Sequence, residues 1–212
     1  MSKILSEIKL SDDEEVVRLT FDDGTKLRIS SYDWYGLSFG RKKGEVSDAE
    51  FESLLRIEEC SKAKYKLLSL LSYSGNSRKG FALKLKKYGF SEESIEYALD
   101  FAEEKKLIND AEYAEALAYE LVEIKKYGPV RVKNEMYKHG VPDAIAKEMI
   151  AKYDIKDEKG LSVYDRNMYE CAVSKAKGLN LSDKNVREKF LASLNRSGYE
   201  FSRLSKLKFT KK

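Results

Sequence analysis

The chain has 212 residues, which is too long for one three-helix domain and short for two large domains. Hydrophobic residues make up 42% and charged residues 36%, with only 2 Pro, which excludes a disordered chain and indicates packed cores beneath solvated, helix-rich surfaces. No apolar run approaches the roughly 20 residues that cross a bilayer, and residues 1–10 lack the pattern of a signal peptide. We therefore expect a cytoplasmic protein without a membrane segment.

The net charge of +4 is unevenly distributed along the chain. Residues 1–60 hold 9 Lys/Arg against 14 Asp/Glu, a balance of −5, and the remaining residues hold 31 against 22, a balance of +9. An excess of positive charge attracts nucleic acid or acidic protein surfaces. We therefore expect an acidic partner for the region after residue 60.

The first predicted element is a small β-hairpin at residues 16–30. Apolar and polar residues alternate on both sides of Asp22-Asp23-Gly24-Thr25, and Asp-Gly between alternating runs is typical of a hairpin turn. Residues 31–47 carry Trp34 and three glycines, and we expect them to form a loop or a short helix. Ser47 and Glu50 have the spacing of a capping box, which predicts a helix over about 48–59.

A helical pattern that ends in glycine then occurs three times. Counting back from Gly89, Gly140 and Gly198, apolar residues stand at minus eight and minus four, which share one face of a helix. These pairs are Phe81 and Leu85, Val132 and Met136, and Phe190 and Leu194. Glycine suits the left-handed conformation that ends a helix, so a β-branched residue there should be costly. A repeat at this period predicts tandem helical modules.

Three helices are predicted in each module. The expected ranges are 62–73, 77–88 and a helix capped by Ser91; then 110–126, capped by Asp110, and helices with Pro129 and Pro142 in their first turns; then 163–177, 182–197 and 200–208. The predicted fold class is mainly α, with tandem three-helix repeats after an N-terminal β-hairpin. The predicted domains are 1–60 (hairpin and linking helix), 61–108, 109–153 and 154–212 (three-helix repeats one to three).

Residues that could bind a metal are poorly placed. The only two cysteines, Cys60 and Cys171, lack paired spacing and are expected to be free thiols. With His139 they do not form the close set that zinc requires. The acidic residues at 12–15 and 22–23 lack the alternating ligand pattern of a calcium loop. We therefore expect no metal site.

Catalytic and cofactor-binding patterns are also missing. His139, the only histidine, precedes a helix-ending glycine, where a cation or donor complements the helix dipole. Gly36, Gly40 and Gly44 lack the Gly-Lys-Ser/Thr of a phosphate-binding loop. We therefore expect no catalytic residues and no cofactor.

Cations recur at fixed positions before the three glycines. Lys87, Lys138 and Arg196 stand at minus two, and Arg131 and Lys189 stand at minus nine in the second and third copies. Minus nine and minus two lie seven residues apart, on nearly the same helix face. Cations in a last turn also complement the helix dipole without a partner, so capping and partner binding both stay open for the minus-two set. These five residues are the candidate partner-binding residues.

Several linked motifs resemble a known protein family. They read LKLKKYGF at 83–90, LINDAEYA at 107–114, KYGPVR at 126–131 and EMYKHGV at 135–141. In this order and spacing they resemble the RecX family of bacterial recombination regulators over residues 64–149. The sequence GEVS at 44–47 and the third repeat ending at 194–199 extend the resemblance. The chain departs from the family pattern at 74–81, the entry to the second helix of the first repeat, and at Met136, where leucine is usual.

The resemblance implies a non-enzymatic protein that binds the filament of the RecA recombinase on single-stranded DNA. It implies an elongated, curved array of modules that lies along the filament groove and inhibits ATPase, strand-exchange and co-protease activities in homologous recombination and the SOS response. We expect the chain itself to be a monomer.

Two alternatives to this function stay open. The first is a stand-alone, sequence-independent module for single-stranded DNA, suggested by the +9 region and by Tyr88, Tyr127 and Tyr199. The second is an enzyme that uses residues 34–44, which would require a pocket with convergent polar groups.

Overall fold

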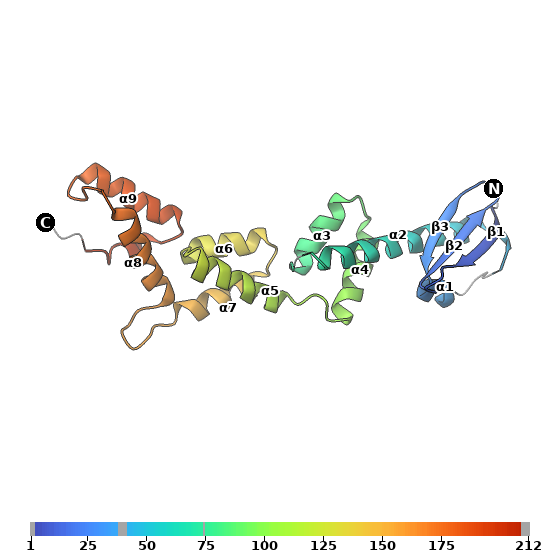
Figure 1. Ribbon diagram of the computed structural model, residues 1–212, viewed down its shortest axis with the longest axis horizontal. Coiled ribbons are helices and arrows are strands. Elements are labelled where there is room, and N and C mark those ends of the chain that lie inside the picture. The colour runs from blue at the N-terminus through green and yellow to red at the C-terminus, as the bar shows by residue number, and fades with distance from the viewer. Residues whose placement is uncertain (1–2, 38–41, 74, 209–212) are drawn as a thin grey trace. The chain divides into compact units, whose positions relative to one another are not determined.

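The structure is a computed structural model that describes residues 3–37, 42–73 and 75–208 (Figure 1). It is mainly helical with an N-terminal antiparallel sheet, as the sequence predicted. The chain divides into two compact units. Unit 1 is Met1–Gly75 with Phe81–Ile108, and unit 2 is Asn76–Gly80 with Asn109–Lys212. No helix within the described ranges is both long and apolar enough to cross a membrane.

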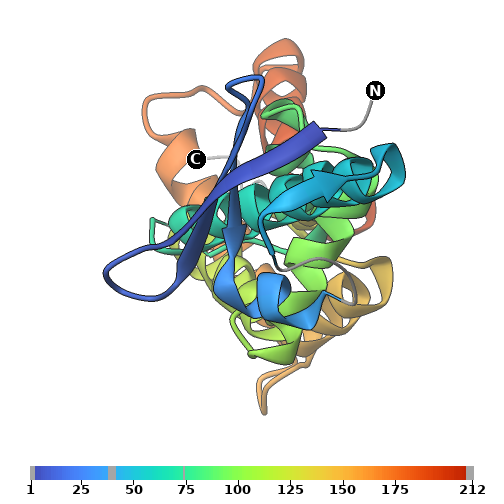
Figure 2. The same ribbon diagram turned by 90° about the vertical axis from the view of Figure 1, so that its right-hand side faces the viewer.

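The sheet in unit 1 has four strands in the order β3-β2-β1-β4. The strands are β1 (Lys3–Leu10), β2 (Val16–Phe21), β3 (Lys26–Ser30) and β4 (Gly44–Val46). The predicted hairpin is confirmed, because β2 and β3 pair antiparallel around a turn in which Gly24 has φ +83°. Figure 2 shows this end of the unit, with β1 as the long dark-blue strand.

Two strands of this sheet were not predicted. A register shift between Leu5 and Glu7 interrupts β1, so its apolar residues do not keep the two-residue period by which a strand is recognised. Strand β4 has only three residues and pairs with β1. Both strands are therefore defined by their pairing within the sheet and not by a local sequence pattern.

The sheet core packs against helices α1 (Ser31–Gly36) and α2 (Asp48–Leu71). Its buried residues are Leu5, Val17, Leu19, Phe21, Leu27, Ile29, Trp34, Val46 and Leu54. The predicted capping box of α2 is confirmed: the Glu50 amide donates to Ser47 Oγ at 3.3 Å, and the Ser47 amide donates to Glu50 Oε2 at 2.9 Å. Residues 38–41, which include Gly40 of the predicted loop, lie outside the described residues.

Helix α2 is one continuous helix where the sequence predicted two, at 48–59 and 62–73. No glycine or proline separates the two predicted ranges. The middle of α2 also caps the outer strand of the sheet: the Arg28 amide donates to Glu58 Oε1 at 2.9 Å, and the Ser30 amide donates to Ser61 Oγ at 3.2 Å. These contacts satisfy edge-strand groups that would otherwise remain open to pairing. Helix α2 crosses residue 60 without a break. The domain boundary at 60/61 stays a prediction from the sequence.

The second half of α2 packs with α3 (Arg78–Lys87) and α4 (Glu92–Glu104) around the first helical core. Phe81 and Leu85, the minus-eight and minus-four residues, are fully buried in it. Ser91 caps α4 as predicted, since its side chain accepts from the Ser94 amide.

Unit 2 contains the remaining helices, among them a short π-helical turn. They are α5 (Asp110–Tyr119), η1 (Glu120–Ile124), α6 (Pro129–Lys138), α7 (Asp143–Asp154), α8 (Val163–Ala176), α9 (Lys184–Arg196) and α10 (Phe201–Leu204). The apolar pairs at minus eight and minus four are buried in the second and third repeats as well.

Four predicted details of unit 2 are wrong. Asn109, not Asp110, caps α5, because its side-chain oxygen accepts from the amides of Ala111 and Glu112. Pro129 does begin α6 as predicted, whereas Pro142 occupies the N-cap of α7. The helix predicted at 110–126 changes to π geometry at Glu120 and ends at Ile124. The helix predicted at 200–208 covers only Phe201–Leu204.

Contacts from the third repeat explain the π turn. Asn167 Nδ2 on α8 donates to the Val122 carbonyl at 2.8 Å. This bond gives a hydrogen-bond partner to a backbone carbonyl that the wider π turn leaves available. The Tyr199 hydroxyl donates to the Lys126 carbonyl at 2.7 Å. These partners lie 45 and 73 residues away in sequence, so no local pattern contained the information.

Asp165 ties the C-terminal helix to α8. Burial alone would raise the pKa of Asp165, but hydrogen bonds from the Ser162 amide and Lys206, with the charge of Arg203, outweigh it and hold this pKa below its usual value. Arg203 Nη1 lies 3.0 Å and Lys206 Nζ 3.2 Å from the carboxylate. This ionic cluster links α8 to residues 203–206, and removing Arg203 would leave the buried Asp165 carboxylate with less compensating charge.

Candidate partner-binding surfaces

All three repeat glycines have the left-handed backbone that the sequence predicted. Their φ angles are +86° for Gly89, +75° for Gly140 and +96° for Gly198. Each follows the last turn of the second helix in its repeat, so glycine removes the strain that a Cβ would cause.

Gly140 also packs closely against Ser77 and the first residues of α3, within unit 2. A Cβ at Gly140 would lie 2.8 Å from Ser77 Oγ and 3.0 Å from Lys79 Cβ. Ser77 Oγ donates to the His139 carbonyl at 2.6 Å and accepts from the Gly80 amide at 3.0 Å. We call this contact the Gly140 joint. It holds the turn at Gly140 against residues 77–80.

The same contact recurs between the second and third repeats. A Cβ at Gly198 would lie 2.5 Å from Arg131 Cβ and 2.6 Å from the Arg131 nitrogen. The Gly128 amide donates to the Ser197 carbonyl at 2.8 Å. Ser77 and Gly128 each stand twelve residues before the glycine of their own repeat. This Gly198 joint is therefore the Gly140 joint moved along by one repeat.

The minus-two cations lie in last turns, as the sequence predicted. Lys87 ends α3, Lys138 ends α6 and Arg196 ends α9, and all three are exposed. Lys138 Nζ lies 3.0 Å from Glu135 Oε1, and this hydrogen bond holds the pKa of Glu135 below its usual value. Lys87 and Arg196 have no ion pair in the part of the chain that the structure describes, so their charges remain available to a partner.

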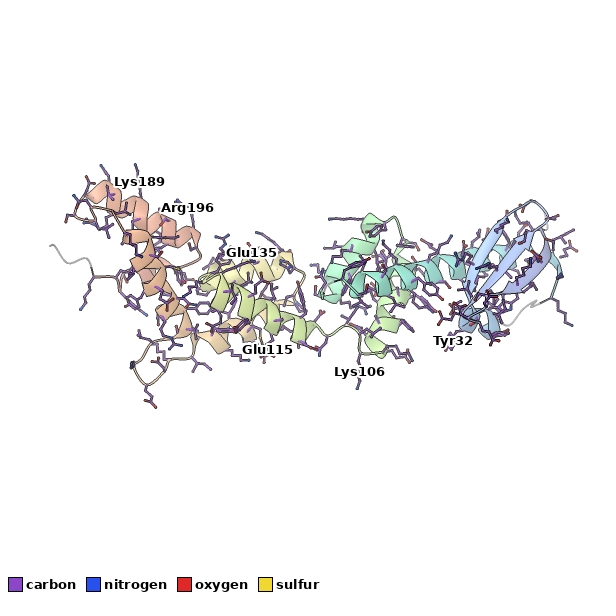
Figure 3. The ribbon with its side chains drawn as sticks, viewed as in Figure 1. Tyr32, Lys106, Glu115, Glu135, Lys189 and Arg196 are labelled. Atoms are coloured by element: carbon purple, nitrogen blue, oxygen red, sulfur yellow. The ribbon has the colours of Figure 1, made fainter. Side chains whose placement is uncertain are left out.

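The minus-nine cations have different surroundings from each other. Arg131 is half-buried at the Gly198 joint, with its guanidinium 3.8 Å from the Tyr127 ring centroid and Nη1 donating to the Arg196 carbonyl at 3.4 Å. Lys189 is exposed on α9 with Arg196, and Figure 3 labels both there. The common outward face predicted for minus nine and minus two is therefore present in the third repeat only. Partner binding by these residues stays a prediction.

Charge separates by helix rather than by repeat. The second helices are basic: α3 holds five Lys/Arg and no Asp/Glu, α6 holds three against one, and α9 holds four against one. In contrast, α4 holds six Asp/Glu and α5 holds three, and neither has a Lys or Arg. The position count from glycine missed Lys79, Lys84 and Lys86 on α3. A charge count for each predicted helix would have found them.

Other candidate sites show little chemistry. No group of three potential metal-binding side chains occurs among the described residues. Cys60 and Cys171 are free thiols, and burial with the charges of Glu93 and Glu59 raises the pKa of Cys60 to about 11. His139 Nδ1 lies 2.9 Å from the Tyr113 hydroxyl.

The segment considered for an enzyme lines a surface recess of about 790 Å³ at residues 31–37. Asp33, the carboxylate among its lining residues, already accepts from the Tyr97 hydroxyl at 2.6 Å and from Ser61 Oγ at 3.1 Å. The carboxylate of this recess is therefore engaged within the fold, and it lies one residue before the 34–44 segment.

The left-handed turns, the recurring joints and the basic second helices define a tandem three-helix-repeat protein. A family model described as RecX, second three-helix domain, matches residues 109–150. The regulatory protein RecX of Clostridioides difficile (strain 630) is 28% identical over 199 residues, which cover 93% of this chain and 89% of that protein. The regulatory protein RecX of Chlorobium limicola is 31% identical over 124 residues, which cover 58% of this chain and 72% of that protein.

The chain belongs to the RecX family. A crystal structure of regulatory protein RecX shares its fold, with a TM-score of 0.74 at 18% identity over 97% of this chain and 98% of the other. The resemblance seen in the sequence motifs is thereby confirmed.

Proposed function

We propose that this chain is a non-enzymatic regulator that binds the RecA filament on single-stranded DNA and inhibits ATPase, strand exchange and co-protease action. Membership in a family whose relatives are named regulatory proteins carries the proposal. The residue chemistry supports binding to an acidic partner, because the second helices α3 and α9 carry an excess of Lys and Arg. We place the protein in the cytoplasm as a monomer, with three repeats at 61–108, 109–153 and 154–212.

The second helices supply the proposed contact surface. Helix α3 combines its five cations with exposed Leu83, and α6 exposes Val130 and Tyr137 beside its cations. Positive charge accelerates the approach of an acidic partner, and exposed apolar groups add contact area once it is bound. A partner held in this way should bind less tightly as salt is raised.

The direct test measures RecA ATPase and strand exchange while the protein is added below the RecA concentration. We expect both rates to fall, with inhibition at substoichiometric ratios. An absence of any effect at every ratio would exclude the function. Stimulation would retain a regulator and exclude inhibition.

A residue-level test replaces Lys87, Lys138 and Arg196 together by Gln. We expect binding to filaments to weaken about tenfold or more while the melting temperature changes little. The matched control replaces exposed Lys105, Lys156 and Lys208 by Gln, which removes the same charge outside the second helices. If both triple variants weaken binding equally, net charge alone acts. If stability falls while binding per folded molecule stays the same, the three cations serve only as helix caps.

A further inference from the structure

A groove on unit 1 combines an apolar floor with a cationic rim. It has a volume of about 530 Å³ and runs between the β2–β3 hairpin, α2 and the end of α3. Its lining residues are Val16, Arg28, Ser61, Lys62, Tyr65, Lys66, Ser69 and Phe90. We call it the basic groove. None of its residues belongs to the five cations considered above.

The aromatic residues of the basic groove leave ring surface exposed. Tyr65 is 40% exposed, and Phe90 is half-buried. Tyr88 is 58% exposed and lies beside the lining residue Lys66, whose Nζ is 3.9 Å from the Tyr88 ring centroid. Flat aromatic faces beside flexible cations are the combination on which single-stranded nucleic acids stack their bases.

The two ends of the basic groove differ in charge. Lys62 is partly neutralised, with Nζ 2.9 Å from Glu58 Oε2. Burial, and then the charges of Glu15 and Asp13, raise the pKa of Tyr65, so carboxylates act on the Val16 end. At the other end, Lys66 has no ion pair in the described ranges, and Tyr88 directly follows Lys86 and Lys87 in the chain.

We infer that the basic groove binds single-stranded nucleic acid. A base lies on Tyr65 and Phe90, its phosphate lies at Lys66, and the next nucleotide continues over Tyr88 toward the end of α3. Arg28 contacts the strand from the sheet side. This activity requires no RecA, so it stands apart from the proposed function. An acidic peptide is the competing occupant, but it would leave the exposed tyrosine faces without a matching group.

The test measures binding of a fluorescent oligo-dT to the full chain without RecA by anisotropy, over a range of salt. The variant Arg28→Gln with Lys66→Gln should bind about tenfold more weakly. The slope of log affinity against log salt should become shallower by about 0.7 for each phosphate that the variant no longer neutralises. The control, Lys9→Gln with Lys105→Gln, removes the same charge from unit 1 outside the groove and should change affinity less than twofold. Equal reductions of affinity in both variants would overturn the proposal.

Base stacking requires a separate measurement. Tyr65→Ala should weaken binding of oligo-dT about fivefold or more and leave an abasic oligonucleotide of the same length nearly unchanged. Fluorescence of Trp34, the single tryptophan, which is buried in the sheet core, confirms that unit 1 remains folded. An equal loss of affinity for both oligonucleotides would exclude a base on Tyr65.

Two further measurements separate the possible occupants. Glu15→Gln should strengthen oligo-dT binding, because it removes a repelling charge from the Val16 end. Binding of polyglutamate to the groove without measurable oligo-dT binding would show an acidic-peptide site and overturn the proposal.

Discussion

The turns at Gly89 and Gly198 have the same local design but different surroundings. Both glycines are left-handed, and both follow a helix whose apolar pair is buried. A Cβ at Gly89 would meet nothing within 4 Å, whereas a Cβ at Gly198 would lie 2.5 Å from Arg131 Cβ. At Gly89, glycine is therefore required by the backbone angle alone. At Gly198 it is required by the angle and by the close approach of the second repeat.

Gly140 lies between these two cases. Its closest neighbour, Ser77 Oγ, belongs to a side chain that can rotate, while the closest neighbours of Gly198 are bound rigidly to the backbone. The same glycine motif therefore contributes differently to stability in each repeat. The turn of the first repeat is the least crowded, because it has no earlier repeat against which to pack.

The largest effect is expected for Gly198→Ala. Backbone strain and overpacking against Arg131 should together destabilise unit 2 by about 3 kcal/mol. Urea unfolding with hydrogen exchange of amides in α6 and α9 measures this loss. The matched control is Gly178→Ala in the same unit, where φ is +76° and a Cβ has open space. Equal costs for the two variants would show that the joint does not restrict residue 198.

A smaller loss is expected for Gly140→Ala. Strain at φ +75° remains, but rotation of Ser77 relieves part of the crowding, so the cost should be about 2 kcal/mol. The same unfolding and exchange measurements, with Gly178→Ala again as control, place it between Gly198→Ala and the open turns. A cost above that of Gly198→Ala would reverse the proposed order of the joints.

Ser77→Ala provides a double-mutant cycle at the Gly140 joint. Alone it removes the hydrogen bonds to the His139 carbonyl and from the Gly80 amide, at a cost of about 1 kcal/mol. Combined with Gly140→Ala it also removes the crowding atom. The double variant should therefore lose less stability than the sum of the single variants, by about 1 kcal/mol. Strict additivity would indicate that Ser77 does not limit the space at Gly140.

The smallest effect is expected for Gly89→Ala. With open space at the Cβ position, only the left-handed backbone is penalised, at about 1 kcal/mol. Urea unfolding followed by Trp34 fluorescence reports on unit 1. Gly24→Ala, at φ +83° and also in open space, is the control in the same unit. A cost well above this control would reveal a packing role for Gly89.

The sequence predicted the elements whose signals are local. The hairpin around Gly24, the capping box of Ser47 and the start of α6 at Pro129 are confirmed. Each depends on residues within a few positions of one another, so the sequence pattern contains the cause. The three left-handed glycines follow for the same reason.

The candidate cations were placed correctly on their helices, but their surroundings were not predictable. Arg131 and Lys189 hold the same repeat position, yet Arg131 contacts the third repeat whereas Lys189 is exposed on α9. The basic groove also combines Arg28 and Lys66 from segments far apart in sequence. Counting positions within one repeat predicts neither the contact of Arg131 nor the proximity of Arg28 and Lys66.

By itself, the sequence determined the helical repeats, their buried apolar pairs, the caps at Ser47 and Ser91 and the charge of each helix, because these properties follow from backbone periodicity and side-chain chemistry over short distances. Tertiary structure decided the continuity of α2, the π turn at η1 and the two joints. In each case the stabilising partner lies 28 or more residues away, as with Glu58 and Arg28 at 30 residues or Asn167 and Val122 at 45. Such contacts form only when packing brings distant segments together.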